Sequence, residues 1–138
     1  MSKIRHVAIC IFRHRGRILV GRGYDEVKKE HFFRPLGGGV EFGEQAAEAI
    51  RREIREELGL EIEDPIQLGV IENRFEYCGK PGHEIVFVFD ARFADPDIYT
   101  QREIPINEAG WDGPAQWLNL ETPCPTPLYP QSLEDLLV

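Results

Sequence analysis

Three glutamates near the middle of the chain are spaced so that they share one side of a helix. Glu53, Glu56 and Glu57 lie at relative positions 0, 3 and 4, and a rotation of about 100° per residue brings such positions to the same helix face. Neighbouring carboxylates repel one another, and a hard divalent cation such as Mg²⁺ or Mn²⁺ removes that repulsion by accepting oxygen ligands. The pattern therefore indicates a candidate metal site.

The alternative is a solvated helix face on which Arg51, Arg52 and Arg55 form ion pairs with the glutamates, which is the commoner arrangement for a charged helix. That alternative leaves the preceding segment unexplained. Residues 37–43 contain four glycines, which let the backbone bend tightly and present its own carbonyls and amides to a ligand. A glycine-rich loop followed by an acidic helix face favours a site for a metal ion and a phosphate.

The helix that must carry these glutamates is expected over residues 44–58. An apolar stripe at three- and four-residue steps should face the core. It consists of Ala47, Ile50, Ile54 and Leu58. Gly43 is the expected N-cap, and Gly59 is the expected left-handed C-cap. Both ends of the helix are therefore marked in the sequence.

The stretch over residues 38–60 resembles a complete Nudix box. The specified positions of that 23-residue pattern are all filled, by Gly38, Glu44, Arg52, Glu53, Ile54, Glu56, Glu57, Gly59 and Leu60. A pattern with so many specified positions is far more specific than a lone glycine motif, although it covers only a sixth of the chain. One departure lies upstream, where the family usually has leucine then proline and this chain has Pro35-Leu36.

The resemblance implies a fold and an activity. The fold is α/β, a Nudix-type α/β/α sandwich with a mixed central sheet, and residues 1–138 are expected to form one such domain. The activity is hydrolysis of a diphosphate linkage in a nucleoside diphosphate joined to another group, with Mg²⁺ as cofactor and Mn²⁺ as a substitute. The residues that the resemblance assigns to the metal are the Gly37 carbonyl, Glu53, Glu56 and Glu57.

The same resemblance assigns catalytic roles. Glu53 is our choice as the base that activates water, Glu57 is catalytic through the metal, and Arg52 orients the glutamates, while Glu44 supports the loop or the metal shell. A base from outside the box is the alternative, because the family sometimes draws one from a later loop. The candidates are Glu103 and Glu108 in that loop, and Glu84 at the start of a strand.

Four residues are candidates for contact with the substrate. Gly38 belongs to the phosphate loop, and Arg34 beside it suits bidentate binding of a phosphate, although a solvent-facing strand residue is equally expected. Tyr77 lies where some Nudix hydrolases of dinucleoside polyphosphates carry a tyrosine that stacks on a base, and packing across a hairpin is the alternative. Glu84 opens a strand, where it can ligate, act as a base or simply be exposed.

The composition of the chain limits its partners and its surroundings. With a net charge of −8 over 138 residues, a nucleic-acid-binding surface is not expected, and the N-terminus is too short and too charged for a signal or membrane segment. Cys10, Cys78 and Cys124 lack a metal-binding or disulfide spacing, which suits the cytoplasm. A small nucleotide is the expected partner, and the oligomeric state stays open, a homodimer included.

The rest of the chain reads as strands and loops around the glycine-rich segment. Residues 4–12, 17–21 and 32–36 are expected strands, and residues 22–30 an expected loop. Residues 66–77 and 85–93 should form a long hairpin after a break at Asp64-Pro65, with the second run a central strand buried on both faces. Residues 94–110 should be a surface loop, 111–118 a short strand, and 131–137 a short helix.

Two other functions are alternatives to hydrolysis. A Nudix-fold module that binds a nucleotide without hydrolysing it often lacks box glutamates, and this chain keeps them all. An isomerase on a related fold would use a catalytic cysteine with an altered box, and none of the three cysteines is an obvious candidate. Hydrolysis is therefore the leading interpretation, and the leaving group stays open, since fold resemblance alone does not determine the substrate.

Overall fold

The computed structural model describes residues 2–137, and its centre is a four-stranded mixed sheet in the order β5-β1-β7-β6. Its strands are β1 (Arg5–Ile11), β5 (Leu36–Gly39), β6 (Ile62–Tyr77) and β7 (Lys80–Phe93). Strand β1 runs parallel to β7 and antiparallel to β5, and β6 runs antiparallel to β7. The mixed α/β architecture expected from the sequence is confirmed.

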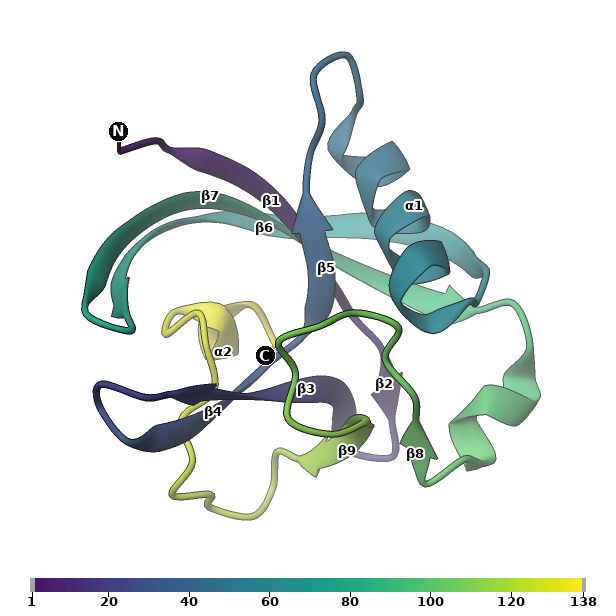
Figure 1. The fold of residues 1–138 in the computed structure, drawn as a ribbon. Helices are drawn as coiled ribbons and strands as arrows, with labels where there is room; N and C mark the ends of the chain where they lie inside the picture. Colours follow the sequence, from purple (N-terminus) through teal and green to yellow (C-terminus); the bar gives the residue numbers. More distant parts are fainter. Residues whose placement is uncertain (1, 138) are drawn as a thin grey trace.

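A second sheet has the order β2-β3-β9-β8, with β4 paired to β3. It contains β2 (Arg13–His14), β3 (Arg17–Asp25), β4 (Glu30–Arg34), β8 (Glu103–Ile104) and β9 (Ala115–Asn119). A 3₁₀ helix, η1 (Pro96–Thr100), precedes β8. Figure 1 shows this sheet below the first one, with the β3–β4 hairpin and the curved β6–β7 hairpin extending to the same side of the molecule.

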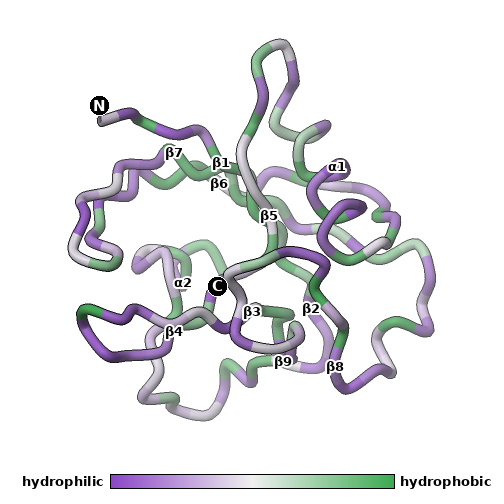
Figure 2. The backbone as a smooth tube through the Cα atoms, viewed as in Figure 1, coloured by the Kyte–Doolittle hydropathy of each residue, from purple (hydrophilic) through white to green (hydrophobic). Residues whose placement is uncertain are grey.

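The alternation of side chains along β1 divides the core into two layers. Ala8 and Cys10 belong to the cluster that contains Ile50 and Ile54 of α1 (Ala46–Leu58). The opposite face contributes Val7, Ile9 and Ile11 to a second cluster that includes Leu133 of α2 (Leu133–Leu136). Figure 2 shows hydrophobic residues along β1 where it passes beneath β5, and mostly hydrophilic ones along the β3–β4 hairpin.

The helix α1 confirms the predicted apolar stripe but begins two residues later than expected. Its N-cap is Gln45 rather than Gly43. The reason is local: the carboxylate of Glu48 accepts the backbone N–H of Gln45 at 2.9 Å, which closes the first turn at that residue. The C-terminus is as predicted, since Gly59 is left-handed at φ 68° and its N–H donates to the Arg55 carbonyl.

The glycine-rich segment is not a loop in its first part. Residues 37–39 belong to β5, where Gly37 pairs with Ile9 and Gly39 with Val7. A Cβ on Gly37 would collide with the Ala8 carbonyl, and one on Gly38 would collide with the Glu53 carboxylate. The glycines therefore let a strand pack tightly between β1 and the acidic helix, instead of bending the chain.

Residues 22–30 are also more ordered than the charge-rich sequence indicated. Strand β3 continues to Asp25 and returns as β4, so the expected loop is a hairpin. The buried carboxylate of Asp25 accepts the N–H groups of Val27 and Lys28 at 3.0 and 3.1 Å, which forms the turn. It also accepts the N–H of Cys78 at 3.2 Å, which joins this hairpin tip to the β6–β7 tip.

The β6–β7 hairpin is confirmed, with two differences. Its turn is the pair Cys78-Gly79, both with positive φ, rather than the longer turn expected. The expected break at Asp64-Pro65 is an irregularity in register between Glu63 and Ile66 inside a continuous strand, because Asp64 adopts a positive φ of 52° and lets the strand resume pairing. Strand β7 lies between β1 and β6, as its apolar sequence predicted.

The last third of the chain largely agrees with the sequence interpretation. Residues 94–110 are mostly exposed, as expected, but include η1 and β8. Strand β9 begins at Ala115, later than expected, because residues 111–114 instead form part of the preceding loop. Helix α2 is confirmed within the predicted range. No helix within residues 2–137 is long and apolar enough to cross a membrane.

Candidate active site

Three carboxylates meet where α1 faces the loop before β9. Glu53 and Glu57 project from successive turns of α1, and Glu108 reaches them from the loop, so that one oxygen from each lies within 4.8 Å of the others. Glu53 and Glu57 are 9% and 1% exposed. The structure thus joins two box glutamates to one of the three candidates from outside the box.

Glu57 is the buried centre of this cluster. Neither of its carboxylate oxygens has a hydrogen-bond partner in the described part of the chain. Burial raises the pKa of its carboxyl to about 9, and the negative charges of Glu108 and Glu53 contribute to the same shift. The backbone of Gly37 acts on this pKa in the opposite direction, but it forms no hydrogen bond with either Glu57 oxygen. An acid in this environment needs a proton or a cation as counterpart.

Arg52 fastens the acidic face to the preceding segment. Its Nε and Nη2 donate to the two oxygens of Glu44 at 2.8 and 2.9 Å. Its Nη2 also donates to the Gly39 carbonyl and its Nη1 to Glu53, both at 2.8 Å. Pairing with Arg52 lowers the pKa of the Glu44 carboxyl to about 2, and pairing with Glu44 raises the pKa of the guanidinium.

Glu56 differs from its two neighbours in position. Its side chain is 60% exposed, and its carboxylate lies 3.3 Å from Arg52 Nη1. It is not part of the group formed by Glu53, Glu57 and Glu108 within residues 2–137. Its predicted place among the metal ligands therefore has less geometric support than that of Glu53 and Glu57.

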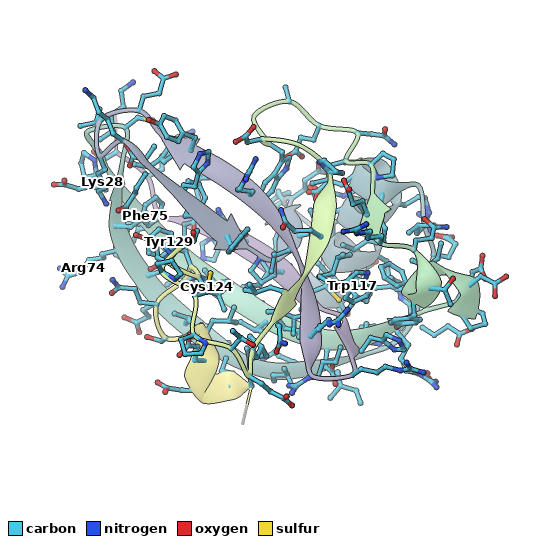
Figure 3. All side chains as sticks on the ribbon, turned by 90° about the horizontal axis from the view of Figure 1, so that it is seen from below. Lys28, Arg74, Phe75, Trp117, Cys124 and Tyr129 are labelled. Carbon is cyan, nitrogen blue, oxygen red and sulfur yellow. The ribbon has the colours of Figure 1, made fainter. Side chains whose placement is uncertain are left out.

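A cavity of about 400 Å³ opens beside the cluster, between the two long hairpins. Glu108 borders it, so the cavity and the carboxylates share one residue. Its aromatic lining is Phe32, Phe75, Tyr77, Trp111 and Tyr129, and its cationic lining is Arg5, Lys28, Arg34 and Arg74. Figure 3 shows Lys28, Phe75 and Tyr129 together at one end of the molecule, well away from Trp117.

Three of the four predicted substrate residues border this cavity. Arg34 and Glu84 both line it and contact each other, with Arg34 Nη2 3.5 Å from Glu84 Oε1. Glu84 is buried, and Arg5 lies 3.7 Å from its other oxygen. Tyr77 is 43% exposed, and its ring meets that of Phe32 edge to face at 5.9 Å. Gly38, the fourth, lies instead against the Glu53 carboxylate.

The structure adds residues that the sequence interpretation did not single out. Trp111 borders the cavity, and its indole Nε1 donates to Glu108 Oε1 at 3.1 Å. Asp25 holds the two hairpin tips together at the far end of the cavity. Because Trp111 lies only three residues after Glu108, its position in the sequence could have indicated a contact with that glutamate. The hydrogen bond between Asp25 and Cys78 depends on tertiary structure and could not have been predicted in this way.

Comparison with known proteins decides the family. The model of the NUDIX domain matches residues 2–132, nearly the whole chain. The chain belongs to the NUDIX family. Its class follows from this membership together with the complete box: a Nudix hydrolase, acting on a phosphoanhydride bond. The cluster of Glu53, Glu57 and Glu108 is accordingly its candidate active site.

Solved structures agree on the fold. A MutT NUDIX hydrolase from Burkholderia pseudomallei is 24% identical, with a TM-score of 0.72 over 99% of this chain and 98% of its own. The E. coli ORF135 protein is 21% identical, with a TM-score of 0.61 over 99% of this chain and 88% of its own. A UDP-X diphosphatase is 20% identical, with a TM-score of 0.65 over 99% of this chain but 62% of its own.

Proposed function

We propose that this Nudix hydrolase cleaves a diphosphate linkage in a nucleoside diphosphate joined to another group, with Mg²⁺ as its cofactor. The observation that carries the proposal is the Glu57 carboxylate, buried without a hydrogen-bond partner in the described residues and close to Glu53 and Glu108. A buried carboxylate without a partner destabilises a fold. A cation bound by Glu57 and Glu53, beside Glu108, removes this cost.

The residues of the cluster fit a hard divalent ion. Every side-chain donor is a carboxylate oxygen, which suits Mg²⁺ or Mn²⁺ better than a softer metal. We assign the ion to Glu53, Glu57 and the Gly37 carbonyl, with Glu56 as a further ligand from the exposed side. When bound, the ion offsets the charge of the diphosphate and of the transition state.

We assign the base to Glu108 rather than to Glu53, our choice from the sequence. Arg52 Nη1 donates to the Glu53 carboxylate at 2.8 Å, which fixes its orientation and suits a ligand. Glu108 borders both the cluster and the cavity in which a substrate would lie. Its Oε1 accepts the Trp111 indole N–H, so Oε2 is the atom that takes the proton from the attacking water.

The other two candidates for the base are less well placed. Glu103 lines a separate groove that also contains Trp117, on a different part of the surface. Glu84 lies between Arg5 and Arg34, and each of its two oxygens faces one of these guanidinium groups. We propose that Glu84 holds Arg34 toward the cavity, where the guanidinium binds a substrate phosphate.

The cavity indicates the part of the substrate that is not cleaved. Its aromatic rings, among them Phe32 and Phe75, provide faces on which a nucleobase can stack. The diphosphate would then extend past Arg34 toward Glu57. Likeness to a UDP-X diphosphatase places nucleotide sugars among the compounds to test.

The cysteines are free thiols, and we propose a cytoplasmic location on that ground.

A hydrolysis screen tests the proposal. The purified protein is incubated with Mg²⁺ and a panel of deoxynucleotide triphosphates, oxidised nucleotides, dinucleoside polyphosphates, nucleotide sugars and ADP-ribose. The products are identified by mass spectrometry, with a parallel series in excess EDTA. We expect at least one compound to be cleaved at a phosphoanhydride bond, and only with the cation present. Tight binding of a nucleotide without cleavage would instead support a non-hydrolysing module.

A further inference from the structure

Glu108 is held in place by one recorded side-chain contact. It belongs to an exposed part of the loop before β9, and in residues 2–137 the hydrogen bond recorded for its side chain is the one from Trp111 Nε1, at 3.1 Å. An exposed glutamate samples several rotamers unless a contact restrains it. The indole therefore selects the orientation in which the carboxylate lies beside Glu53 and Glu57.

Trp111 is itself firmly seated. Its ring lies against the Cα of Gly21 in β3, so closely that a Cβ at that position would collide with it, and it packs against the core cluster that contains α1. The loop is fastened on both sides of Glu108. Asn107 donates its N–H to the Glu57 carbonyl at 2.6 Å, and Asp112 donates its N–H to the Arg22 carbonyl at 2.7 Å.

We propose that Trp111 is a positioning residue that holds the Glu108 carboxylate in the acidic cluster. The inference rests on the function proposed above, since it gives Glu108 a partner in the reaction. It assigns a role to a residue that lies outside the Nudix box and whose indole N–H donates to Glu108, which is also outside the box. The restraint comes from β3 through Gly21, an element separate from the helix that carries Glu53 and Glu57.

The chain offers a matched control for the experiment. Trp117 also donates its indole N–H to an oxygen, the Gln101 carbonyl at 2.9 Å, and it lies on the side of the molecule away from Lys28, Phe75 and Tyr129 (Figure 3). Trp111→Phe and Trp117→Phe each keep an aromatic ring and remove one indole hydrogen bond. They differ in whether that bond reaches Glu108.

The first readout is the binding of Mn²⁺ to each purified variant. It is measured as the loss of the free-ion signal in electron paramagnetic resonance. We expect Trp111→Phe to bind Mn²⁺ about tenfold more weakly than wild type, because the Glu108 carboxylate is then no longer held beside the ion that Glu53 and Glu57 bind. Its kcat should fall by a similar factor, with KM little changed because the ring still lines the cavity. Trp117→Phe should match wild type, and equal behaviour of the two variants would overturn the proposal.

The second readout is a double-mutant cycle with Glu108→Ala. If Trp111 acts through Glu108, the Mn²⁺ affinity and kcat of the double variant should equal those of Glu108→Ala alone. Losses that multiply would overturn the positioning role, because Trp111 would then act by another route. Wild-type behaviour of Glu108→Ala would overturn both this inference and the role of Glu108 in the proposed function. A defective Glu108→Ala beside an intact Trp111→Phe would overturn this inference alone.

Discussion

Arg52 and Glu44 form a two-point ion pair that links the acidic helix to the segment before it. The two guanidinium nitrogens lie 2.8 and 2.9 Å from the two carboxylate oxygens. The same guanidinium reaches the Gly39 carbonyl and Glu53. One side chain thus sets the position of the glycine segment relative to a glutamate of the candidate metal site.

Replacing Arg52 by lysine should therefore impair catalysis more than folding. Lysine keeps the charge but cannot reproduce the planar, two-point geometry. We expect kcat to fall roughly ten- to a hundredfold, as small misplacements of catalytic groups do, while the protein remains folded by circular dichroism. Arg51→Lys is the control, since Arg51 donates to the Ile62 carbonyl instead. Equal losses in both variants would contradict the role given to Arg52.

Glu57→Gln should have different effects on the melting temperatures of the metal-free and the metal-bound protein. Both carboxylate oxygens of Glu57 are buried without a partner in the described residues, so a neutral side chain of the same shape should leave the metal-free melting temperature unchanged or raise it. Mn²⁺ should raise the melting temperature of wild type by mass action and have little effect on the variant. Differential scanning fluorimetry with and without the ion provides this comparison, and an equal response in the variant would argue against ligation by Glu57.

Tyr77 should affect substrate binding through its ring. If it stacks on a nucleobase, the aromatic face contributes about 1–3 kcal/mol, so Tyr77→Ala should raise KM while Tyr77→Phe changes it little. The hydroxyl makes one long hydrogen bond, 3.4 Å to the Tyr24 carbonyl, so its loss should matter less. A destabilised Tyr77→Ala with a wild-type KM would show that the ring only packs against Phe32 in the hairpin.

Asp25 should make the cavity wall sensitive to acid. Hydrogen bonds from the backbone, that of Lys28 first, lower the pKa of its carboxyl below the usual 3.8. Its stabilising effect is thus present above that pH and is lost as the pH falls through the lower folded value. Asp25→Asn should reduce the melting temperature by several degrees at pH 7. Below pH 4, the melting temperature of the variant should depend less on pH than that of wild type. The melting temperatures of both proteins are measured from pH 7 to pH 2.5. An equal dependence on pH in the two proteins would refute this effect.

Much of the framework could be predicted because it depends on local patterns. The apolar periodicity of Ile50 and Ile54 marks α1, and the left-handed Gly59 ends it as expected. The continuous apolar run in β7 marks a central strand. These features depend on residues that are near one another in sequence, where helix and strand periods can be read directly.

The sequence-based predictions were wrong where a residue distant in the sequence determines the local structure. Gly37 and Gly38 have low strand propensity, yet they pair with β1 because only glycine fits between Ala8 and Glu53. Asp25 orders a charged segment through a bond to Cys78, fifty-three residues away. Glu108 could be named as a candidate from its loop, but its meeting with Glu57 depends on how that loop crosses α1. Such contacts leave no period in the sequence.

The most direct measurement is the initial rate of diphosphate cleavage as a function of Mg²⁺ concentration, for wild type, Glu57→Gln and Glu48→Gln. The substrate is the best one found in the screen. Glu48 lies on the same helix but only caps its first turn, at 2.9 Å from the Gln45 N–H, and glutamine keeps that acceptor. We predict a saturable rate for wild type and Glu48→Gln, and for Glu57→Gln a kcat at least about a hundredfold lower, or roughly 2.7 kcal/mol. Equal rates in all three proteins, or full activity in excess EDTA, would contradict a metal-dependent reaction centred on Glu57.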